Sequence, residues 1–233
     1  MIVCIILLVI GLGALIYFLV EKIKKYSIKE TIIKAIVSLL FIALAVYSFI
    51  KNNSNTFGIF VITGLIFGLI GDITLELKYV DLNKNKMYTY IGFISFGIGH
   101  ILYITGIFLN FANIVPWFIY VLPFVLGLIG GILVVVLEKP MGLEYGEYKL
   151  ICFIYGIILF SMTATTVSFA ITYKLTNATL NMLAIAGTLF AVSDLILSGT
   201  YFGKNRDKPF DLISNALTYY VAQYLIAFSI FFI

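Results

Sequence analysis

The sequence predicts an all-α membrane protein, a single bundle of eight transmembrane helices. Its 233 residues are 62% hydrophobic and 11% charged, whereas soluble domains are about 45–50% apolar and about 25% charged. With a mean hydropathy of +1.12, the chain has more apolar surface than a soluble fold of this size can bury. The apolar residues also fall into runs of about 20, the length of a helix that crosses a bilayer.

Eight such runs follow one another along the chain, separated by short polar segments. They cover residues 2–20, 32–50, 57–75, 88–109, 114–137, 150–172, 179–199 and 212–232. The first run has no basic residue before it and is longer than the core of a signal peptide, so we expect it to remain as a span. No long linker or change of composition appears, and residues 1–233 are therefore expected to form one integral membrane domain.

Basic residues gather in the odd-numbered loops. Thirteen of the fifteen Lys and Arg lie in these loops or at their edges, and only Lys51 and Lys174 lie on the other side. Because positively charged loops stay in the cytoplasm, we expect cytoplasmic odd loops and both termini outside. The net charge of +4 then reflects membrane topology, and no nucleic-acid partner is expected. Cys4 and Cys152 would lie near opposite faces and could not form a disulfide.

A short internal similarity suggests a 4+4 repeat. GLIFGLIGDITL at 64–75, in the third run, resembles GTLFAVSDLIL at 187–197, in the seventh. Runs that are four apart cross the membrane in the same direction, so the two halves would form a parallel repeat.

Few ionisable residues lie inside the runs. Each costs about 2.5–3.5 kcal/mol to insert, which makes it a candidate functional residue. Asp72 and Asp194 are the two carboxylates in otherwise apolar stretches, and His100, the only histidine, lies in the middle of the fourth run. Gly64 and Gly68 precede Asp72 at four-residue spacing, which would let a neighbouring helix approach the carboxylate.

With the expected orientation, these residues lie at similar depths in the cytoplasmic half of the membrane. Polar residues of the sixth and eighth runs reach the same region: Tyr155, Ser161, Thr165, Ser168, Asn215, Tyr219, Tyr220 and Gln223. A single polar pocket is one interpretation. The structural alternative is that the aspartates only hold neighbouring helices, that His100 is a packing residue, and that the hydroxyls bond to the backbone.

Residue types exclude several chemistries. One histidine and two distant cysteines cannot supply a zinc site, and the nucleophile-elbow, phosphate-loop and dinucleotide motifs are absent. We therefore expect no metal and no cofactor, which leaves carboxylate chemistry or proton-coupled transport.

Four motifs together resemble the YhhN-type lysoplasmalogenases, which are multi-span membrane hydrolases of bacteria and animals. The motifs are Gly71-Asp72, Gly92-Phe93…Phe96…His100-x-x-Tyr103, Gly187-x-x-Phe190-x-x-Ser193-Asp194 and Tyr219-Tyr220-x-x-Gln223-x-Leu225-Ile226. They lie in the third, fourth, seventh and eighth runs, so the resemblance covers most of the chain. One departure is Ala35, which follows Lys34 at a place where a Lys-Pro pair is expected.

The resemblance implies that lysoplasmalogens, single-chain phospholipids in a membrane, are hydrolysed at the vinyl-ether bond to a fatty aldehyde and a glycerophospho-headgroup. We also expect the membrane to be that of a bacterial cell. Vinyl ethers are cleaved by protonation at carbon, so the site needs a carboxylic acid and an anion that stabilises the resulting cation. Two nearby carboxylates in low dielectric can share one proton and supply both, and we expect Asp72 and Asp194 to be this catalytic pair. The supporting or substrate-binding residues would be His100, Tyr103, Asn215, Tyr219, Tyr220, Gln223, Glu76, Lys34 and Lys78, with the two lysines near the phosphate.

Two other functions fit the same residues. Asp72, His100 and Asp194 could form the relay of a proton-coupled transporter, which would need access from both faces of the membrane. The chain could also bind lipid without catalysing a reaction.

Overall fold

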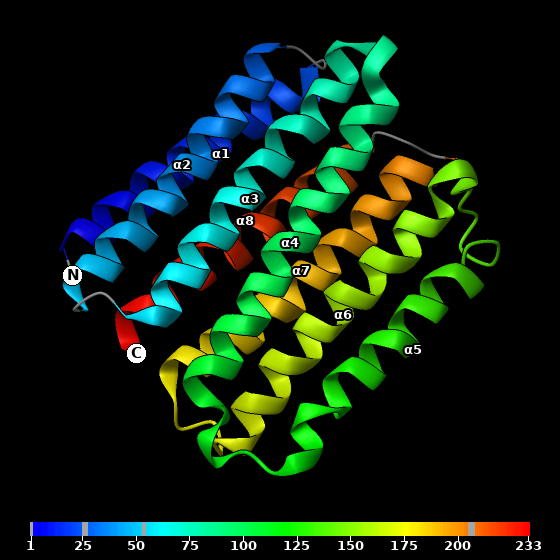
Figure 1. Cartoon of the computed structure of the whole chain (residues 1–233). Coiled ribbons are helices and arrows are strands. Elements are labelled where there is room, and N and C mark those ends of the chain that lie inside the picture. The colour runs from blue at the N-terminus through cyan, green and yellow to red at the C-terminus, as the bar shows by residue number, and fades with distance from the viewer. Residues whose placement is uncertain (1, 25–27, 53–54, 205–207) are drawn as a thin grey trace.

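The computed structural model describes residues 2–24, 28–52, 55–204 and 208–233, and these residues form eight long helices (Figure 1). The helices are α1 (Ile2–Lys24), α2 (Ile28–Lys51), α3 (Thr56–Val80), α4 (Asn85–Phe111), α5 (Leu122–Val136), α6 (Lys149–Thr172), α7 (Ala178–Phe202) and α8 (Pro209–Ser229). Eight segments built on these helices are long and apolar enough to cross a membrane. The predicted all-α, eight-span fold is confirmed.

Two asparagines set the depth of the two candidate aspartates. Asn55 accepts a hydrogen bond from the Gly58 N–H at the start of α3, and Asn177 accepts one from the Leu180 N–H at the start of α7. Such N-caps fix where a helix begins because they satisfy its first free N–H groups. Asp72 and Asp194 each lie 17 residues after the cap of their helix, and therefore at the same depth along it.

The largest differences from the expected runs are at two helix boundaries. α3 continues to Val80, so residues 76–80, which were expected in a loop, extend its C-terminal end. α5 begins at Leu122, eight residues later than expected, because Pro123 favours a helix start and Trp117–Tyr120 forms a separate 3₁₀ turn after Pro116.

Six helices form a closed ring in the order α2, α3, α4, α6, α7, α8, each packed against the next and α8 packed against α2. α1 lies outside the ring against α2 and α8, and α5 lies outside it against α6 (Figure 1). A half-turn of this ring would place α2 on α6, α3 on α7 and α4 on α8. The 4+4 repeat stays a prediction, but this packing order is the one that a parallel duplication would give.

Small residues on α3 allow the close packing that was predicted beside Asp72. A Cβ atom added at Gly64 would lie 2.3 Å from the Tyr103 ring, and one at Gly71 would lie 2.6 Å from the Phe96 ring. A larger residue at either position would therefore push α4 away from α3.

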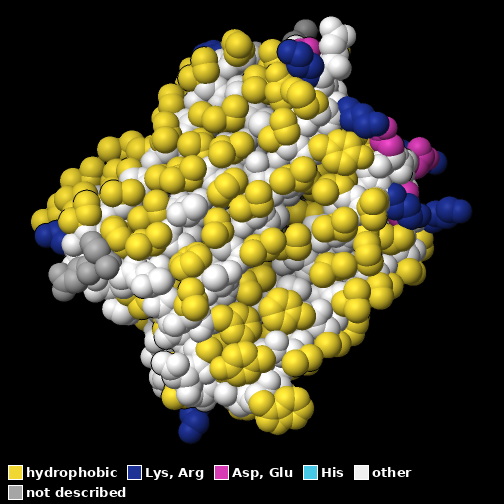
Figure 2. Space-filling view, viewed as in Figure 1, with side chains coloured by type: hydrophobic (Ala, Val, Ile, Leu, Met, Phe, Trp, Pro, Cys, Tyr) yellow, Lys and Arg dark blue, Asp and Glu magenta, His cyan; other side chains and the backbone are white. Residues whose placement is uncertain are grey.

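The outer surface is apolar along the helices and charged at one end. On the face shown in Figure 2, most Lys, Arg, Asp and Glu side chains gather at the upper right. This is the end at which α1, α3, α5 and α7 finish in Figure 1, whereas Lys51 ends α2 and Lys174 follows α6 at the other end. Lys25 and Arg206, two of the thirteen basic residues counted above, lie outside the described residues. Cys4 and Cys152 are both free and buried.

Candidate active site at two buried aspartates

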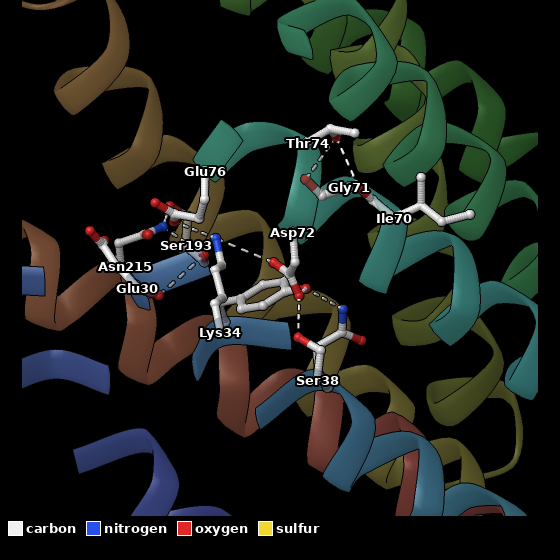
Figure 3. A network of polar contacts seen from close by, with 12 residues as sticks. Glu30, Lys34, Ser38, Ile70, Gly71, Asp72, Thr74, Glu76, Ser193 and Asn215 are labelled. Carbon is white, nitrogen blue, oxygen red and sulfur yellow. Dashed lines mark hydrogen bonds and ion pairs between the residues drawn. The ribbon is translucent and has the colours of Figure 1, made fainter. Parts of the chain in front are cut away.

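Asp72 is a fully buried carboxylate with three donor groups around it. Ser38 Oγ of α2 donates to its Oδ2 at 2.6 Å, and the Tyr219 hydroxyl of α8 donates to the same oxygen at 2.7 Å. Lys34 Nζ lies 3.4 Å from Oδ1. Asp72 is only 1% exposed, so these donors replace the water that an ionised carboxylate would otherwise need. Figure 3 shows Lys34 and Ser38 reaching Asp72 from α2.

Lys34 belongs to a larger buried network of charges. Its Nζ also donates to Glu76 Oε1 at 2.8 Å, and Lys22 Nζ donates to the same Glu76 oxygen at 2.8 Å and to Glu30 Oε1 at 3.1 Å. Glu30 and Glu76 are 1% and 3% exposed. Lys34 is thus neutralised by two carboxylates, and its predicted contact with a phosphate stays a prediction.

Asp194 has very different surroundings. Its Oδ2 accepts a hydrogen bond from the Tyr155 hydroxyl of α6, and His100 Nε2 of α4 lies 3.2 Å from that hydroxyl. The His100 ring is held by Phe190, whose centroid is 4.6 Å away. Within the described ranges no ion pair involves Asp194. The side chain is only partly buried, because it faces two cavities.

The first cavity brings the two predicted catalytic residues together. It has a volume of about 40 Å³ and is lined by Asp72 and Asp194, with Lys34, Glu76 and Asn215 among the other lining residues. No hydrogen bond joins the two carboxylates in the described part of the chain, and each has its own donors. The expectation that they share one proton stays a prediction, and the geometry favours separate roles.

The second cavity is larger and almost entirely apolar. Its volume is about 410 Å³, within the range of about 300–1,000 Å³ that is usual for small-molecule sites. Asp194 lines both cavities, as do Leu75, Phe96, Leu197 and Tyr201. The Asp194 carboxyl therefore lies where a polar space and an apolar space meet.

Two of the other predicted residues support this arrangement. Asn215 lines the small cavity and donates from Nδ2 to the backbone oxygen and to Oγ of Ser193, at 2.8 and 2.9 Å. Gln223 Nε2 donates to the Tyr219 hydroxyl at 2.9 Å. Gln223 thereby orients the hydroxyl that contacts Asp72.

Like His100 and Gln223, three further predicted residues line neither cavity. Tyr103 packs edge-on against His100, with centroids 6.2 Å apart, and Tyr220 packs edge-on against Tyr219 at 5.0 Å. Lys78 Nζ lies 3.0 Å from the centre of the Tyr201 ring, in a cation–π contact. These residues support the walls of the site from behind.

Sequence reasoning missed Ser38 and Lys22. Ser38 follows Lys34 by four residues, as Glu76 follows Asp72, so each pair shares a helix face. The same four-residue spacing on the neighbouring second and third runs was the feature of the sequence that pointed to Ser38 as a neighbour of Asp72. Lys22 was counted only as a loop charge because it lies at the end of an apolar run, yet its amine is folded back onto Glu76 and Glu30.

Among the residues that the structure describes, no group of three or more His, Cys, Asp or Glu side chains could hold a metal ion. The described acidic side chains near the site are paired instead with lysines or hydroxyl groups.

One protein-family model covers most of the chain. The model of the YhhN family matches residues 29–230, which includes the residues of both cavities except Lys22. No match was found among curated proteins or among solved structures. Since the family match covers most of the sequence, the chain belongs to the YhhN family.

Proposed function

We propose that this protein is a lysoplasmalogenase, a membrane hydrolase that cleaves the vinyl-ether bond of alkenyl glycerophosphocholine or glycerophosphoethanolamine. Membership of the YhhN family supports a hydrolase. The main structural support is that Asp194 lies between an apolar and a polar cavity, with the lysine-paired Asp72 lining the polar one. A lysoplasmalogen likewise has an apolar and a polar part, because its vinyl ether joins one long hydrocarbon chain to a polar headgroup.

The reaction begins when the Asp194 carboxylic acid protonates the vinyl-ether carbon that is not bonded to oxygen. The π electrons of the double bond form the new C–H bond, and the ether oxygen stabilises the positive charge on the adjacent carbon as an oxocarbenium ion. Asp72, as an anion lining the same cavity, stabilises this cation. Water adds to the cation and gives its proton to the Asp194 carboxylate. The hemiacetal then collapses to a fatty aldehyde and the free glycerol hydroxyl.

The surroundings of the two carboxyl groups support this assignment of roles. Lys34, Ser38 and Tyr219 all donate to Asp72, so its ionised form is solvated. Asp194 receives the Tyr155 hydroxyl on one oxygen and faces the apolar cavity. In such surroundings a neutral carboxylic acid costs less than an anion. His100 holds Tyr155 and thereby positions the Asp194 carboxyl group.

Polar residues in the other half of the bundle argue against a transporter. Ser48 and Thr179 are buried there, and so is Thr165, which was expected beside the aspartates but lies in the second half of α6; each donates to a backbone carbonyl. In the described residues these hydroxyls are therefore occupied in helix packing rather than in a relay that continues from Asp194. A pocket that opens to one half of the membrane fits an enzyme better than a conduit.

We further propose that the odd-numbered loops face the cytoplasm of a bacterial cell, which would place the site in the inner half of its membrane. Single cysteines in a variant without Cys4 and Cys152 test this sidedness. An impermeant thiol reagent on intact cells should label Thr176→Cys, between α6 and α7, and not Asn83→Cys, between α3 and α4. The opposite pattern would reverse the orientation. Asn53 and Asn205, which would serve the same purpose, lie outside the described residues.

Mass spectrometry of the products tests the proposed reaction. Purified protein in lipid nanodiscs should convert an alkenyl lysophospholipid to aldehyde and glycerophospho-headgroup, and should leave the saturated alkyl ether of equal chain length intact. Chelation with EDTA should not change the rate. If the parent protein releases no more aldehyde than Asp194→Asn, the proposed function is wrong.

A further inference from the structure

The apolar cavity opens sideways, between α5 and α7. Among the α-helices α5 packs against α6 alone, and it lies at the edge of the bundle (Figure 1). Leu195 of α7 and Ile129 and Leu133 of α5 line the cavity, yet they are 43%, 48% and 47% exposed. Side chains that line a cavity and are also exposed on the outer surface lie at the opening of that cavity. The cavity is therefore a groove, called here the α5–α7 groove, that faces the lipid.

Close packing fixes α5 beside this groove. A Cβ atom at Gly127 would lie 1.9 Å from Ser161 Oγ, and one at Gly131 would lie 2.4 Å from the Ile157 side chain. Because α5 is locked onto α6 by these small residues, the space on its other side is a constant feature of the fold.

The dimensions of the groove suit one hydrocarbon chain. Lining residues extend from Leu126 of α5 to its C-cap, Leu137, which is about 16 Å at the helical rise of about 1.5 Å per residue. An extended alkyl chain advances about 1.25 Å per carbon, given C–C bonds of about 1.5 Å. The groove therefore holds about 13 carbons in line. Asp194 and Tyr155 are among the residues that line it.

We propose that the α5–α7 groove binds the hydrocarbon chain of a single-chain phospholipid and admits it directly from the bilayer. The chain lies along α5, the bond to be cleaved lies against Asp194, and the headgroup points to the small polar cavity. The claim that the bond beside Asp194 is cleaved rests on the function proposed above. The claim that the hydrocarbon chain binds here rests on the groove alone. A helix of a partner protein is a poorer occupant, because it would press apolar side chains against the Asp194 carboxyl group without supplying a donor.

Tryptophan fluorescence tests binding independently of catalysis. Trp117 is the only tryptophan and is replaced by phenylalanine; a new one is then placed in the groove as Leu133→Trp. Leu128→Trp is the matched control, since Leu128 is 47% exposed on the same helix but does not line the groove. The probe is a saturated alkyl-ether lysophosphocholine with bromine in its chain, added to nanodiscs.

The groove tryptophan should be quenched saturably, and unbrominated alkyl-ether lysolipid should restore its fluorescence. The control should be quenched only in proportion to the bromolipid content of the membrane. Equal, unsaturable quenching at both positions would overturn the chain site, whether or not the protein releases aldehyde.

Filling the groove provides a kinetic test. Ser198→Trp places a large ring among the lining residues, and Val192→Trp places the same ring on the exposed surface of α7, outside the groove. Loss of several buried methylene contacts should raise KM for the alkenyl lysolipid about tenfold or more in Ser198→Trp, with no change in Val192→Trp. Ser198→Leu, a smaller block, should give an intermediate KM if Ser198→Trp folds poorly. An unchanged KM in a folded Ser198 variant would contradict the proposal.

Discussion

Asp72 and Asp194 occupy equivalent places on two similar helices, yet their neighbours differ. Each lies 17 residues after an asparagine cap, and each helix occupies a corresponding place in the six-helix ring. Asp72 is surrounded by a lysine and two hydroxyl donors from α2 and α8, whereas Asp194 receives one tyrosine hydroxyl from α6 and faces an apolar groove. The adjacent helices, rather than the helix that bears the aspartate, therefore determine what each carboxyl group can do.

The largest expected effect comes from removing either carboxyl group. Asp194→Asn lacks the acid and Asp72→Asn lacks the anion, so each should lower the rate of aldehyde release by about 10²–10⁴-fold. Groups that act together are non-additive, and the double variant should be scarcely slower than either single one. Rates are compared at equal amounts of folded protein. If the losses of rate in the two single variants add up in the double variant, Asp72 and Asp194 act independently.

A second prediction concerns stability in the charged region alone. Lys34→Met leaves Asp72 and Glu76 buried with one cation fewer, which should destabilise the protein by about 3–5 kcal/mol. Thermal unfolding in detergent measures the change. Lys84→Met is the control, because Lys84 forms a solvent-exposed pair with Asp81 at 3.8 Å, and such pairs contribute little. Similar unfolding temperatures for both variants would mean that the buried network does not stabilise the fold.

A third prediction concerns the Tyr155 hydroxyl, which donates a hydrogen bond to Asp194. Tyr155→Phe removes the link between His100 and Asp194 while keeping the ring, and should reduce kcat about 10- to 100-fold, as loss of a hydrogen bond to a carboxyl group would. Tyr173→Phe is the matched control, because the Tyr173 hydroxyl bonds to the Phe111 carbonyl at the other end of α6. The hypothesis fails if both variants keep the parental kcat.

The smallest effect is expected in the connection between α5 and α6, which contributes Met141 and Tyr145 to the lining of the groove. Lys149 Nζ and the Tyr145 N–H both donate to Glu138, and they hold the pKa of this carboxyl group below its usual value. A lowered pKa stabilises the folded state above the unfolded pKa, and this stabilisation is lost as the pH falls through the folded pKa. Glu138→Gln should therefore unfold at a slightly lower temperature than the parent at neutral pH, and the difference should disappear in acid. A difference that grows in acid would contradict this.

Much of the fold followed from the sequence because hydrophobic runs of membrane length permit little else than helices. The two aspartates were found for the same reason, since a carboxylate in an apolar run is rare. The partners of the aspartates were predicted less completely: Tyr219 and Tyr155 were expected in the same region without being assigned to a carboxyl group, and Ser38 was missed. Ser38 and Tyr155 are ordinary residues of apolar helices, and only the order of helices in the ring brings them to the carboxyl groups. The late start of α5 depended on local proline geometry, which a hydrophobicity pattern does not contain.

Infrared spectroscopy can determine directly which of the two carboxyl groups holds the proton. At neutral pH the parent protein in lipid should show the C=O stretching band of a protonated carboxyl group, with the expected shift in D₂O. That band should be lost in Asp194→Asn and retained in Asp72→Asn. If the band is instead lost in Asp72→Asn and retained in Asp194→Asn, then Asp72 is the acid and the roles proposed for the two regions are wrong.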